Sequence, residues 1–442
     1  MRHPYLDRLK AADLSVHSGW VRRVASGRIE ATGPFCTIGD ICEIEAAGAE
    51  GAADQVPVLA EVAAVEEAHV VLVPLDPTRP VFPDARVTVC PSQGLAPVGP
   101  AFGGRLIDAL AQPLDSGGRI GSTLRTPLVG KVMAPLERSE PTSILQTGLR
   151  AIDGLLPIGR GQRIGIFAAS GVGKTTLVSQ LARQVDCDRC ILCLVGERGR
   201  EVNTLWRDLP TGGAADRFTC VAATSDVSAT LRARAVSQAL CLAEYWRSEG
   251  EYVLLIVDSV TRYAMALREI GLAAGEPPTL RAYTPNVFAA LPRVVERCGG
   301  RNAGGSITAI MTVLSETDDV DDPIVEVMKS LLDGHVILSR TLAEQRHFPA
   351  IDVVKSVSRQ SDALMSEAHQ AHASKALRRL AVYEESRVMI DSGIYKPGGN
   401  ARLDDAVSMR PALQTFLQQK KTENSSLEST LSALLQLSGS GG

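Results

Sequence analysis

The sequence predicts an α/β protein with a small antiparallel β domain, a larger domain built on a parallel sheet, and a helical C-terminal part. Three patterns follow one another along the 442 residues: short β-rich segments, apolar runs that alternate with helix-length amphipathic stretches, and a continuous helical pattern. Alternation of strands and helices is typical of a parallel sheet covered on both faces. We expect an N-terminal lead at 1–16 with a possible docking role, a β-barrel domain at 17–93, the α/β domain at 94–365, a helical domain at 366–420 and a flexible tail at 421–442.

Each part is predicted from its own local pattern. The first has β-rich segments separated by Gly, Pro and Asp, as in a small antiparallel barrel. The last contains EAHQAHASKALRRLAVYEESRVMI, which has helical composition and spacing. In between, the apolar runs expected to form the core strands are RIGIFA, CILCLVG, YVLLIVDS, SITAIMTVL and HVILSR.

The composition is that of an ordinary globular protein, with 45% hydrophobic and 22% charged residues. A formal net charge of -4 does not give the basic footprint of a nucleic-acid-binding protein, so we expect no nucleic-acid partner. Apolar runs stay below the roughly 18 residues that a membrane span requires, and the first segment has no apolar core of a signal peptide. We therefore expect a cytoplasmic protein.

The nine cysteines are an odd number scattered through strand-like segments, which indicates reduced thiols and not a disulfide framework. Cys187, Cys190 and Cys193 form a C-x2-C-x2-C run similar to a metal or iron–sulfur ligand set. No fourth Cys or His lies nearby in sequence, and Cys190 and Cys193 fall inside the apolar run CILCLVG. We interpret them as small hydrophobic residues of a buried strand.

The strongest chemical signal is AASGVGKT, which follows RIGIFA and precedes TLVSQLARQV, the strand–loop–helix context of a phosphate-binding P-loop. Gly171 and Gly173 let backbone N–H groups curl around phosphate oxygens, and the helix start adds its dipole. Lys174 reaches the β- and γ-phosphates of ATP, and the Thr175 hydroxyl ligates Mg²⁺. Alanine at the first position, where glycine is usual, costs little if its φ is negative. The predicted nucleotide-binding residues are Ala168, Ala169, Ser170, Gly171, Val172, Gly173, Lys174, Thr175 and Thr176.

Two acidic residues follow other predicted core strands. Asp258 ends YVLLIVD and is the expected second anchor for Mg²⁺, its alternative role being the N-cap of the next helix. Arg262 follows within one turn, in reach of the same phosphate pocket. Glu197 follows CILCLVG at the same sheet edge, and hydrolysis needs a carboxylate there to orient the attacking water. Arg198 joins the candidate catalytic residues, whereas Glu201 is equally well explained by a solvated charged loop.

These segments, in this order and spacing, resemble the catalytic subunits of the rotary ATPase superfamily, which includes the F1 β subunit and the flagellar and type III export ATPases. The resemblance covers about residues 17–420 and is carried by LQTGLRAIDGLLPIGRGQRIGIFAASGVGKTTL, VGERGREV, VDSVTRYAMALREIGLAAGEPP and SLLDGHVILSRTLAEQRHFPAIDVVKSVSR. VDSVTRYA, EPPTLRAYTPNVFAALPRVVER and TVLSETDDVDDPI are more similar to export ATPases than to F1. Two departures are Arg346, where glycine is common, and RAYTPNVF in place of RGYPPSVF.

The resemblance implies an N-terminal β-barrel, a RecA-like P-loop domain with a mainly parallel sheet and a C-terminal helical domain. It also implies a ring of six subunits with ATP bound between neighbours. By the same resemblance Lys174 and Thr175 contact phosphate and Mg²⁺, Glu197 is the catalytic glutamate, Asp258 is the Walker B acid, Arg359 is the arginine finger, Phe348 packs on adenine and Tyr395 is a second stacking residue.

The implied function is ATP hydrolysis coupled to protein export through a type III apparatus, of injectisome or flagellar kind, with release of chaperones and unfolding of substrates. The implied partners are a stator-like linker, a central stalk, chaperone–effector complexes and, peripherally, the inner-membrane export gate at the base of the apparatus. One alternative is a subunit of an ion-translocating F/V-type rotary ATPase. Another is a Rho-type RNA translocase, which also carries D-S-x-T-R and F-P-A-I-D segments, but the predicted barrel lacks the aromatic and basic residues that hold single-stranded RNA.

Overall fold

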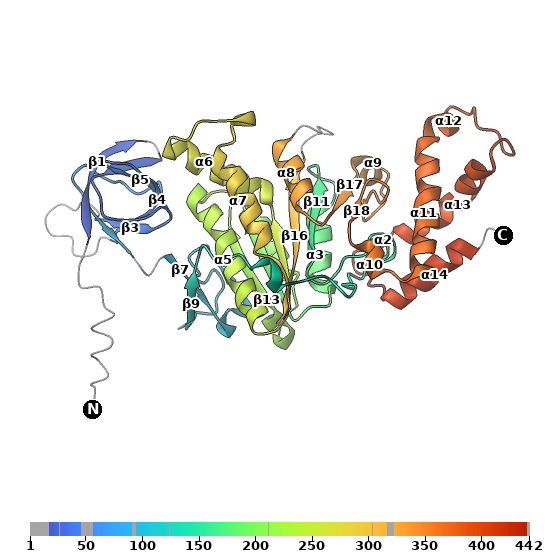
Figure 1. Ribbon diagram of the computed structural model, residues 1–442, viewed down its shortest axis with the longest axis horizontal. Helices are drawn as coiled ribbons and strands as arrows, with labels where there is room; N and C mark the ends of the chain where they lie inside the picture. The colour runs from blue at the N-terminus through green and yellow to red at the C-terminus, as the bar shows by residue number, and fades with distance from the viewer. Residues whose placement is uncertain are drawn as a thin grey trace.

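The computed structural model describes residues 17–25, 27–45, 56–90, 94–122, 124–210, 212–302, 304–315 and 322–439. The predicted N-terminal lead lies outside these residues. The described elements form three successive bodies along the long axis, with the barrel at one end and the C-terminal helices at the other (Figure 1). Within the described ranges, no helix combines the length and the apolarity that crossing a bilayer demands.

The first body is a closed antiparallel barrel with the strand order β1-β2-β5-β4-β3-β6. In β4, Val58, Ala60 and Val62 are fully buried while the residues between them are partly exposed, so one side of the strand fills the interior. The same strand contacts helix α6, which places the barrel against the central domain. The barrel strands are β1 (Ser18–Ala25), β2 (Arg28–Ala31), β3 (Ile41–Ile44), β4 (Val58–Val65), β5 (Val70–Pro74) and β6 (Arg86–Val89).

The central domain is built on a mainly parallel sheet with the order β18-β17-β11-β16-β14-β12-β13-β8. All five predicted core strands are present as β11, β12, β14, β16 and β17. We had not predicted β13 and β8, because FTCVAA is short and contains a threonine and β8 has only three residues. The strands are β8 (Arg105–Ile107), β11 (Arg163–Ala168), β12 (Arg189–Val195), β13 (Phe218–Ala223), β14 (Tyr252–Asp258), β16 (Ser306–Leu314), β17 (Gly334–Leu338) and β18 (Val357–Ser358), with small pairings by β7 (Leu95–Val98), β9 (Leu124–Pro127), β10 (Arg138–Ser139) and β15 (Gly299–Arg301).

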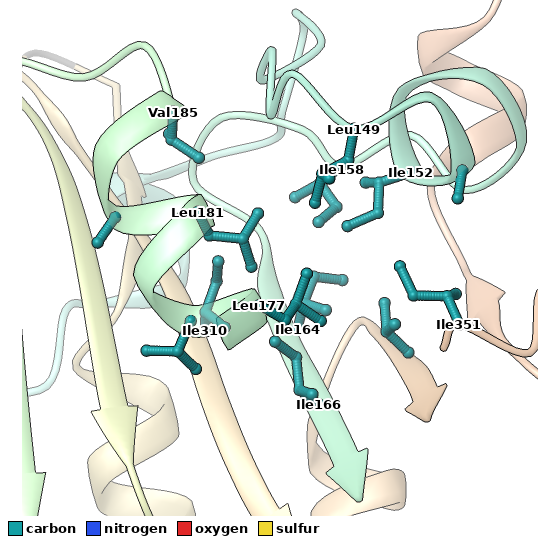
Figure 2. Packing of buried hydrophobic residues seen from close by; sticks show 14 of the residues in the cluster. Leu149, Ile152, Ile158, Ile164, Ile166, Leu177, Leu181, Val185, Ile310 and Ile351 are labelled. Carbon is teal, nitrogen blue, oxygen red and sulfur yellow. The ribbon is translucent and has the colours of Figure 1, made fainter. Parts of the chain in front are cut away.

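Both faces of the sheet are covered by helices, which explains why its strands are continuous apolar runs. Helices α2, α3 and α4 and the C-terminal helices pack on one face, and α5 to α8 pack on the other. Figure 2 shows the first face, where Leu177 and Leu181 of α3 meet Ile164 and Ile166 of β11. The helices of this domain are α2 (Arg150–Leu155), α3 (Lys174–Gln184), α4 (Gly199–Arg207), α5 (Ala229–Ser248), α6 (Val260–Ala274), α7 (Pro285–Glu296), α8 (Pro323–Leu331), α9 (Arg340–Glu344) and α10 (Ser361–Leu364).

The cysteine run lies where the apolar pattern predicted it. Cys190 and Cys193 are fully buried in β12 and point to opposite faces of the sheet, each within a hydrophobic cluster. Burial raises the pKa of both thiols well above the ordinary value. They therefore act as small hydrophobic residues in this fold.

The C-terminal body consists of α11 (Glu367–Glu385), α12 (Arg387–Asp391), α13 (Ala401–Leu417) and α14 (Leu427–Gly439). The flexible tail that we predicted from residue 421 is wrong for α14, which packs against α2, α11 and α13. Leu434 is 1% exposed and belongs to the same hydrophobic cluster as the face of the sheet that carries α3. The Ser- and Gly-rich ending favoured a flexible tail, although Leu427, Leu431 and Leu434 are spaced for one or two amphipathic turns.

Both departures from the family pattern fall in the central domain, at backbone positions with positive φ. Ala282, which stands where the family pattern has glycine, has φ 59° in the loop between α6 and α7. The left-handed region costs a residue with a side chain roughly 1–2 kcal/mol. The glycine that is usual there would avoid this cost.

Candidate active site

The predicted P-loop connects β11 to α3 at the carboxyl edge of the sheet. Gly171 and Gly173 have φ 81° and 96°, the left-handed region that glycine adopts without steric cost. Ala168 closes β11 with the extended backbone of a strand and is not among the residues with positive φ, so alanine is tolerated there. Lys174 is the first residue of α3, so the helix N-terminus faces the loop. The backbone is therefore arranged to bind an anion.

Lys174 lies between two carboxylates that come from neighbouring strands. Its Nζ forms an ion pair with Asp258 Oδ1 at the end of β14 and lies 3.4 Å from Glu197 Oε1, just after β12. All three side chains are largely buried. Asp258 also accepts a 2.6 Å hydrogen bond from Thr312 Oγ1 of β16. The alternative role of Asp258 as a helix cap is wrong, because Ser259 is the N-cap of α6.

Burial raises the pKa of the Glu197 carboxyl. Lys174 opposes this rise, whereas the carboxyls of Asp258 and Glu201 reinforce it. Arg262 Nε lies 4.0 Å from Glu197 Oε1, so the predicted arginine is close to the glutamate. A carboxylate with a raised pKa beside a phosphate-binding loop has the properties of a general base.

Close packing around Arg262 explains the glycine before Glu197. Gly196 has φ 69°, and a Cβ atom added to it would lie 2.5 Å from Cδ of Arg262. Arg198 follows Glu197 as the N-cap residue of α4, and its side chain is exposed. The structure thus brings Arg262 to Glu197 and leaves Arg198 facing solvent.

The oxygen donors at this edge fit Mg²⁺. Thr175 is exposed in the first turn of α3, and Asp258 supplies a carboxylate. No group of three or more His, Cys, Asp and Glu residues that could hold a metal occurs in the part of the chain that the structure describes. Magnesium is usually held by one or two protein oxygens together with substrate phosphates, so a dedicated protein cage is not required.

A cavity of about 810 Å³ opens beside the P-loop. Phe348 lines it, is 41% exposed, and lies 3.6 Å from the position that a Cβ atom on Gly173 would occupy. Arg346 also lines the cavity and has φ 59°, which explains why glycine is common at this position in the family pattern. An aromatic side chain next to a phosphate-binding loop is suited to stack on a nucleotide base.

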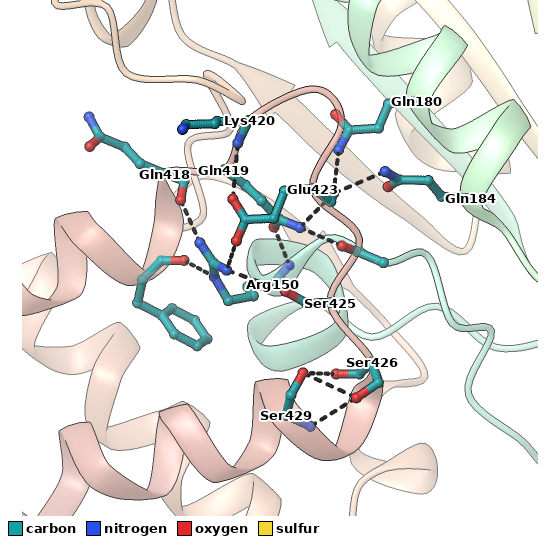
Figure 3. Close-up of polar contacts among 12 residues, drawn as sticks. Arg150, Gln180, Gln184, Gln418, Gln419, Lys420, Glu423, Ser425, Ser426 and Ser429 are labelled. Carbon is teal, nitrogen blue, oxygen red and sulfur yellow. Dashed lines mark hydrogen bonds and ion pairs between the residues drawn. The ribbon is translucent and has the colours of Figure 1, made fainter.

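The cavity is completed by residues that we had not predicted. The far wall is formed by the segment between α13 and α14, and Arg150 of α2 lines the cavity and contacts this segment (Figure 3). The stretch QQKKTEN has no spacing or residue type that marks a binding site, so the sequence contains no signal for it. The unpredicted lining residues are Arg150, Leu177, Gln180, Leu338, Arg346, Pro349, Ala350, Thr415, Gln418, Gln419, Lys420, Lys421 and Glu423.

Tyr395 does not lie at this cavity, so the structure contradicts our prediction of a second stacking residue. It belongs to the connection between α12 and α13, and its hydroxyl donates a 2.6 Å hydrogen bond to Asp404 Oδ1. Its place in the C-terminal hairpin is fixed by this bond. Sequence position alone could not show that the chain turns away from the P-loop after α11.

Arg359 is exposed just after the edge strand β18, and its Nη2 donates to the carbonyl oxygen of Lys329 at 3.0 Å. β18 pairs with the beginning of β17, where Gly334 faces Ser358 and also Ile164 of β11. The P-loop follows the other end of β11, four residues further along. At about 3.3 Å per residue, Arg359 is roughly 13 Å behind the phosphate-binding edge. Within one chain it therefore lies near the opposite end of the strands from the P-loop.

Comparisons with known proteins agree with this architecture. Residues 148–358 match the nucleotide-binding domain of the ATP synthase alpha/beta family, and residues 365–436 match the T3SS EscN ATPase C-terminal domain. The flagellum-specific ATP synthase of Bacillus subtilis is 40% identical over 437 residues, with 98% of each chain covered. The type 3 secretion system ATPase of Sinorhizobium fredii is 42% identical over 429 residues, covering 97% of this chain and 94% of the relative.

Solved structures agree with the sequence relatives. The assembled ATPase EscN from the enteropathogenic E. coli type III secretion system matches with a TM-score of 0.89 and 38% identity, covering 95% of this chain and all of that one. EscN in complex with its central stalk EscO matches with a TM-score of 0.85 and 37% identity, again over 95% of this chain and all of that one. The resemblance drawn from the sequence motifs therefore extends over nearly the whole chain.

Proposed function

Because this chain belongs to the family of type III secretion and flagellar export ATPases, we propose that it hydrolyses Mg²⁺-ATP at the P-loop edge of its sheet. The observation that carries this assignment is the convergence of Lys174, Glu197 and Asp258, which are far apart in sequence, at one point beside the loop. The match at residues 365–436 to a type III ATPase domain favours an export ATPase over an ion-translocating rotary subunit.

The reaction follows from the chemistry of these groups. Backbone N–H groups between Ala168 and Thr175 bind the phosphates, and Lys174 neutralises charge on the β- and γ-phosphates. Glu197, held near Lys174 and Arg262, accepts a proton from the attacking water and orients it in line with the γ-phosphate. Thr175 and Asp258 would hold Mg²⁺, which would supply further charge neutralisation when bound.

The base of the nucleotide occupies the 810 Å³ cavity, where Phe348 provides the stacking surface. This placement puts the base and the phosphates on opposite sides of Gly173, which Phe348 and Lys174 both adjoin. Adenine is accordingly held by contacts from the cavity wall, whereas the reacting phosphate is held by the sheet edge.

The active assembly is a homo-oligomeric ring of six in which Arg359 reaches the nucleotide of a neighbouring subunit. Support comes from the position of Arg359 behind its own P-loop edge and from the assembled state of the EscN relative. An arginine that approaches from the neighbour stabilises charge on the transferred phosphoryl group. The nucleotide site is then complete only at a subunit interface.

The proposed setting is the cytoplasmic face of the export apparatus. A central stalk protein is the first proposed partner, since the EscN relative binds EscO. The other proposed partners are a stator-like linker, chaperone–effector complexes and the inner-membrane export gate, near which the ring associates peripherally. ATP hydrolysis there releases chaperones and unfolds substrates for export.

The assignment is tested by Lys174→Ala, which removes the cation that faces the phosphates while the apolar core of the sheet is unchanged. We expect a soluble protein with less than about a tenth of wild-type turnover, a barrier increase of more than ~1.4 kcal/mol. The exposed Lys131, changed to alanine, is the matched control and should keep wild-type activity. Wild-type turnover by Lys174→Ala would remove the P-loop assignment.

A further inference from the structure

One wall of the nucleotide cavity comes from a polar segment near the end of the described chain. Residues 418–423 belong to the connection between α13 and α14, and all of them except Thr422 line the cavity. Their sequence, QQKKTE, contains no apolar side chain that could anchor the segment in a core. Its position must therefore be set by hydrogen bonds and ion pairs.

Arg150 connects the two ends of this segment (Figure 3). On one side its Nε donates to the carbonyl oxygen of Phe416 at 2.8 Å, and its Nη2 donates to that of Gln418 at 2.6 Å. On the other side its Nη1 contacts the Glu423 carboxylate and donates to Ser425 Oγ at 3.3 Å. The planar guanidinium suits this role, because its donors point in several fixed directions.

The same network reaches the stacking residue and the P-loop helix. Gln419 is 6% exposed, and its backbone N–H donates to the carbonyl oxygen of Phe348 at 2.9 Å. Its side chain accepts from the backbone N–H of Arg150 at 3.0 Å. Gln180 and Gln184 of α3 both donate to the carbonyl oxygen of Glu423, at 3.3 and 2.9 Å. The segment is thus attached to Phe348 on one side and to α3 on the other.

We propose that Arg150 is a positioning residue for the nucleotide base: it holds residues 418–421 in the wall of the cavity that Phe348 also lines. It does not touch the reacting phosphate, which lies at the sheet edge. Loss of Arg150 should therefore weaken binding of the base and leave phosphate binding and chemistry unchanged. The inference depends on the proposed function only in placing the base of ATP in this cavity.

The test compares a ligand that has a base with one that does not. In the full-length Arg150→Met variant, ADP and inorganic tripolyphosphate are measured as competitive inhibitors of ATP hydrolysis. With several hydrogen bonds lost, we expect the KM for ATP and the Ki for ADP to rise roughly tenfold. The Ki for tripolyphosphate should stay within about twofold of the wild-type value, since the groups that hold phosphates are intact. The kcat at saturating ATP should stay within about threefold for the same reason.

Two further variants separate positioning from general stability. Glu423→Gln keeps a hydrogen-bond acceptor near Arg150 but removes the charge, so it should raise the Ki for ADP by about threefold and spare that for tripolyphosphate. Arg160→Met is the control: Arg160 pairs with Asp186 at 2.8 Å in the same domain, and its loss should change neither Ki.

Equal increases in both inhibition constants, or no increase for ADP, would overturn the role of Arg150. The placement of ATP is checked independently by Lys174→Ala, which should weaken binding of tripolyphosphate measured directly by calorimetry. If tripolyphosphate binds Lys174→Ala as it binds the wild type, then the proposed phosphate site is wrong, whatever the behaviour of Arg150.

Discussion

The phosphate end and the base end of the nucleotide site are built in different ways. At the phosphate end, the P-loop, Glu197 and Asp258 all lie at the carboxyl ends of parallel strands of one sheet, β11, β12 and β14. At the base end, Phe348, Arg150 and residues 418–423 come from segments separated by up to 273 residues and joined by hydrogen bonds. Phosphate chemistry demands particular residue types, whereas many surfaces can enclose an aromatic ring. The phosphate end should therefore control turnover, and the base end should control affinity.

The largest effect is expected from loss of Arg359, the arginine that we propose a neighbouring subunit contributes to the phosphate end. Arg359→Ala should bind ATP and assemble but lose roughly 10³- to 10⁵-fold in turnover, the range for an arginine that stabilises the transferred phosphoryl group. The exposed Arg340, paired with Glu344, provides a control whose loss should change little. A loss below about tenfold in Arg359→Ala, measured in single-turnover assays, would contradict a catalytic arginine.

Mixing variants tests whether this arginine acts between subunits. Arg359→Ala and Lys174→Ala together can form interfaces that pair an intact P-loop with an intact arginine from the neighbour, so partial recovery of activity is expected. If mixed rings form but activity does not recover, either the arginine acts within its own chain or hydrolysis requires every interface in the ring to be intact. A covalently linked dimer that carries one substitution in each half distinguishes these two cases.

The next effect lies wholly within the phosphate end. Glu197→Gln keeps the shape of the side chain but cannot accept a proton, so turnover should fall by roughly two to four decades while ATP still binds. Glu201→Gln is the matched variant, because Glu201 is the adjacent carboxyl at the start of α4. Should Glu201→Gln be the inactive variant and Glu197→Gln the active one, the catalytic base would be Glu201.

At the base end, Phe348→Ala should raise the KM for ATP roughly tenfold, since stacking of an aromatic side chain on a base contributes about 1–3 kcal/mol. The kcat should change by less than about threefold, because the phosphate contacts are intact. Phe348→Tyr keeps the ring and should restore affinity. A fall in kcat with unchanged KM would show that the base end controls turnover and not affinity.

The smallest effect concerns Tyr395, which the structure places in neither end. Tyr395→Phe removes the hydrogen bond to Asp404 and should lower the free energy of unfolding only slightly, because water can replace the partner of an exposed hydroxyl. Its KM for ATP should match the wild type within about twofold. If the KM for ATP rose as much as in Phe348→Ala under the same conditions, Tyr395 would contact the base after all.

Much of the fold and the phosphate end could be predicted from the sequence, and the base end could not. Apolar runs and glycine spacing report strands and the P-loop directly, since each depends on neighbouring residues. Phe348 was predicted from family resemblance, but Arg150 and the segment 418–423 depend on where α13 ends relative to α2. The same limitation produced the wrong tail and the wrong place for Tyr395: both depend on long-range packing that local pattern does not encode.

The carbonyl oxygen of Glu423, which accepts hydrogen bonds from Gln180 and Gln184 of α3, has a consequence for how the chain can be shortened. Cutting the chain after Arg359 would retain the whole parallel sheet and every proposed catalytic side chain, yet it would delete one wall of the cavity. The smallest fragment with native nucleotide affinity must therefore extend at least through residue 425, where the contacts of Arg150 end. The end of the parallel sheet is therefore not the end of the part of the chain that binds the nucleotide.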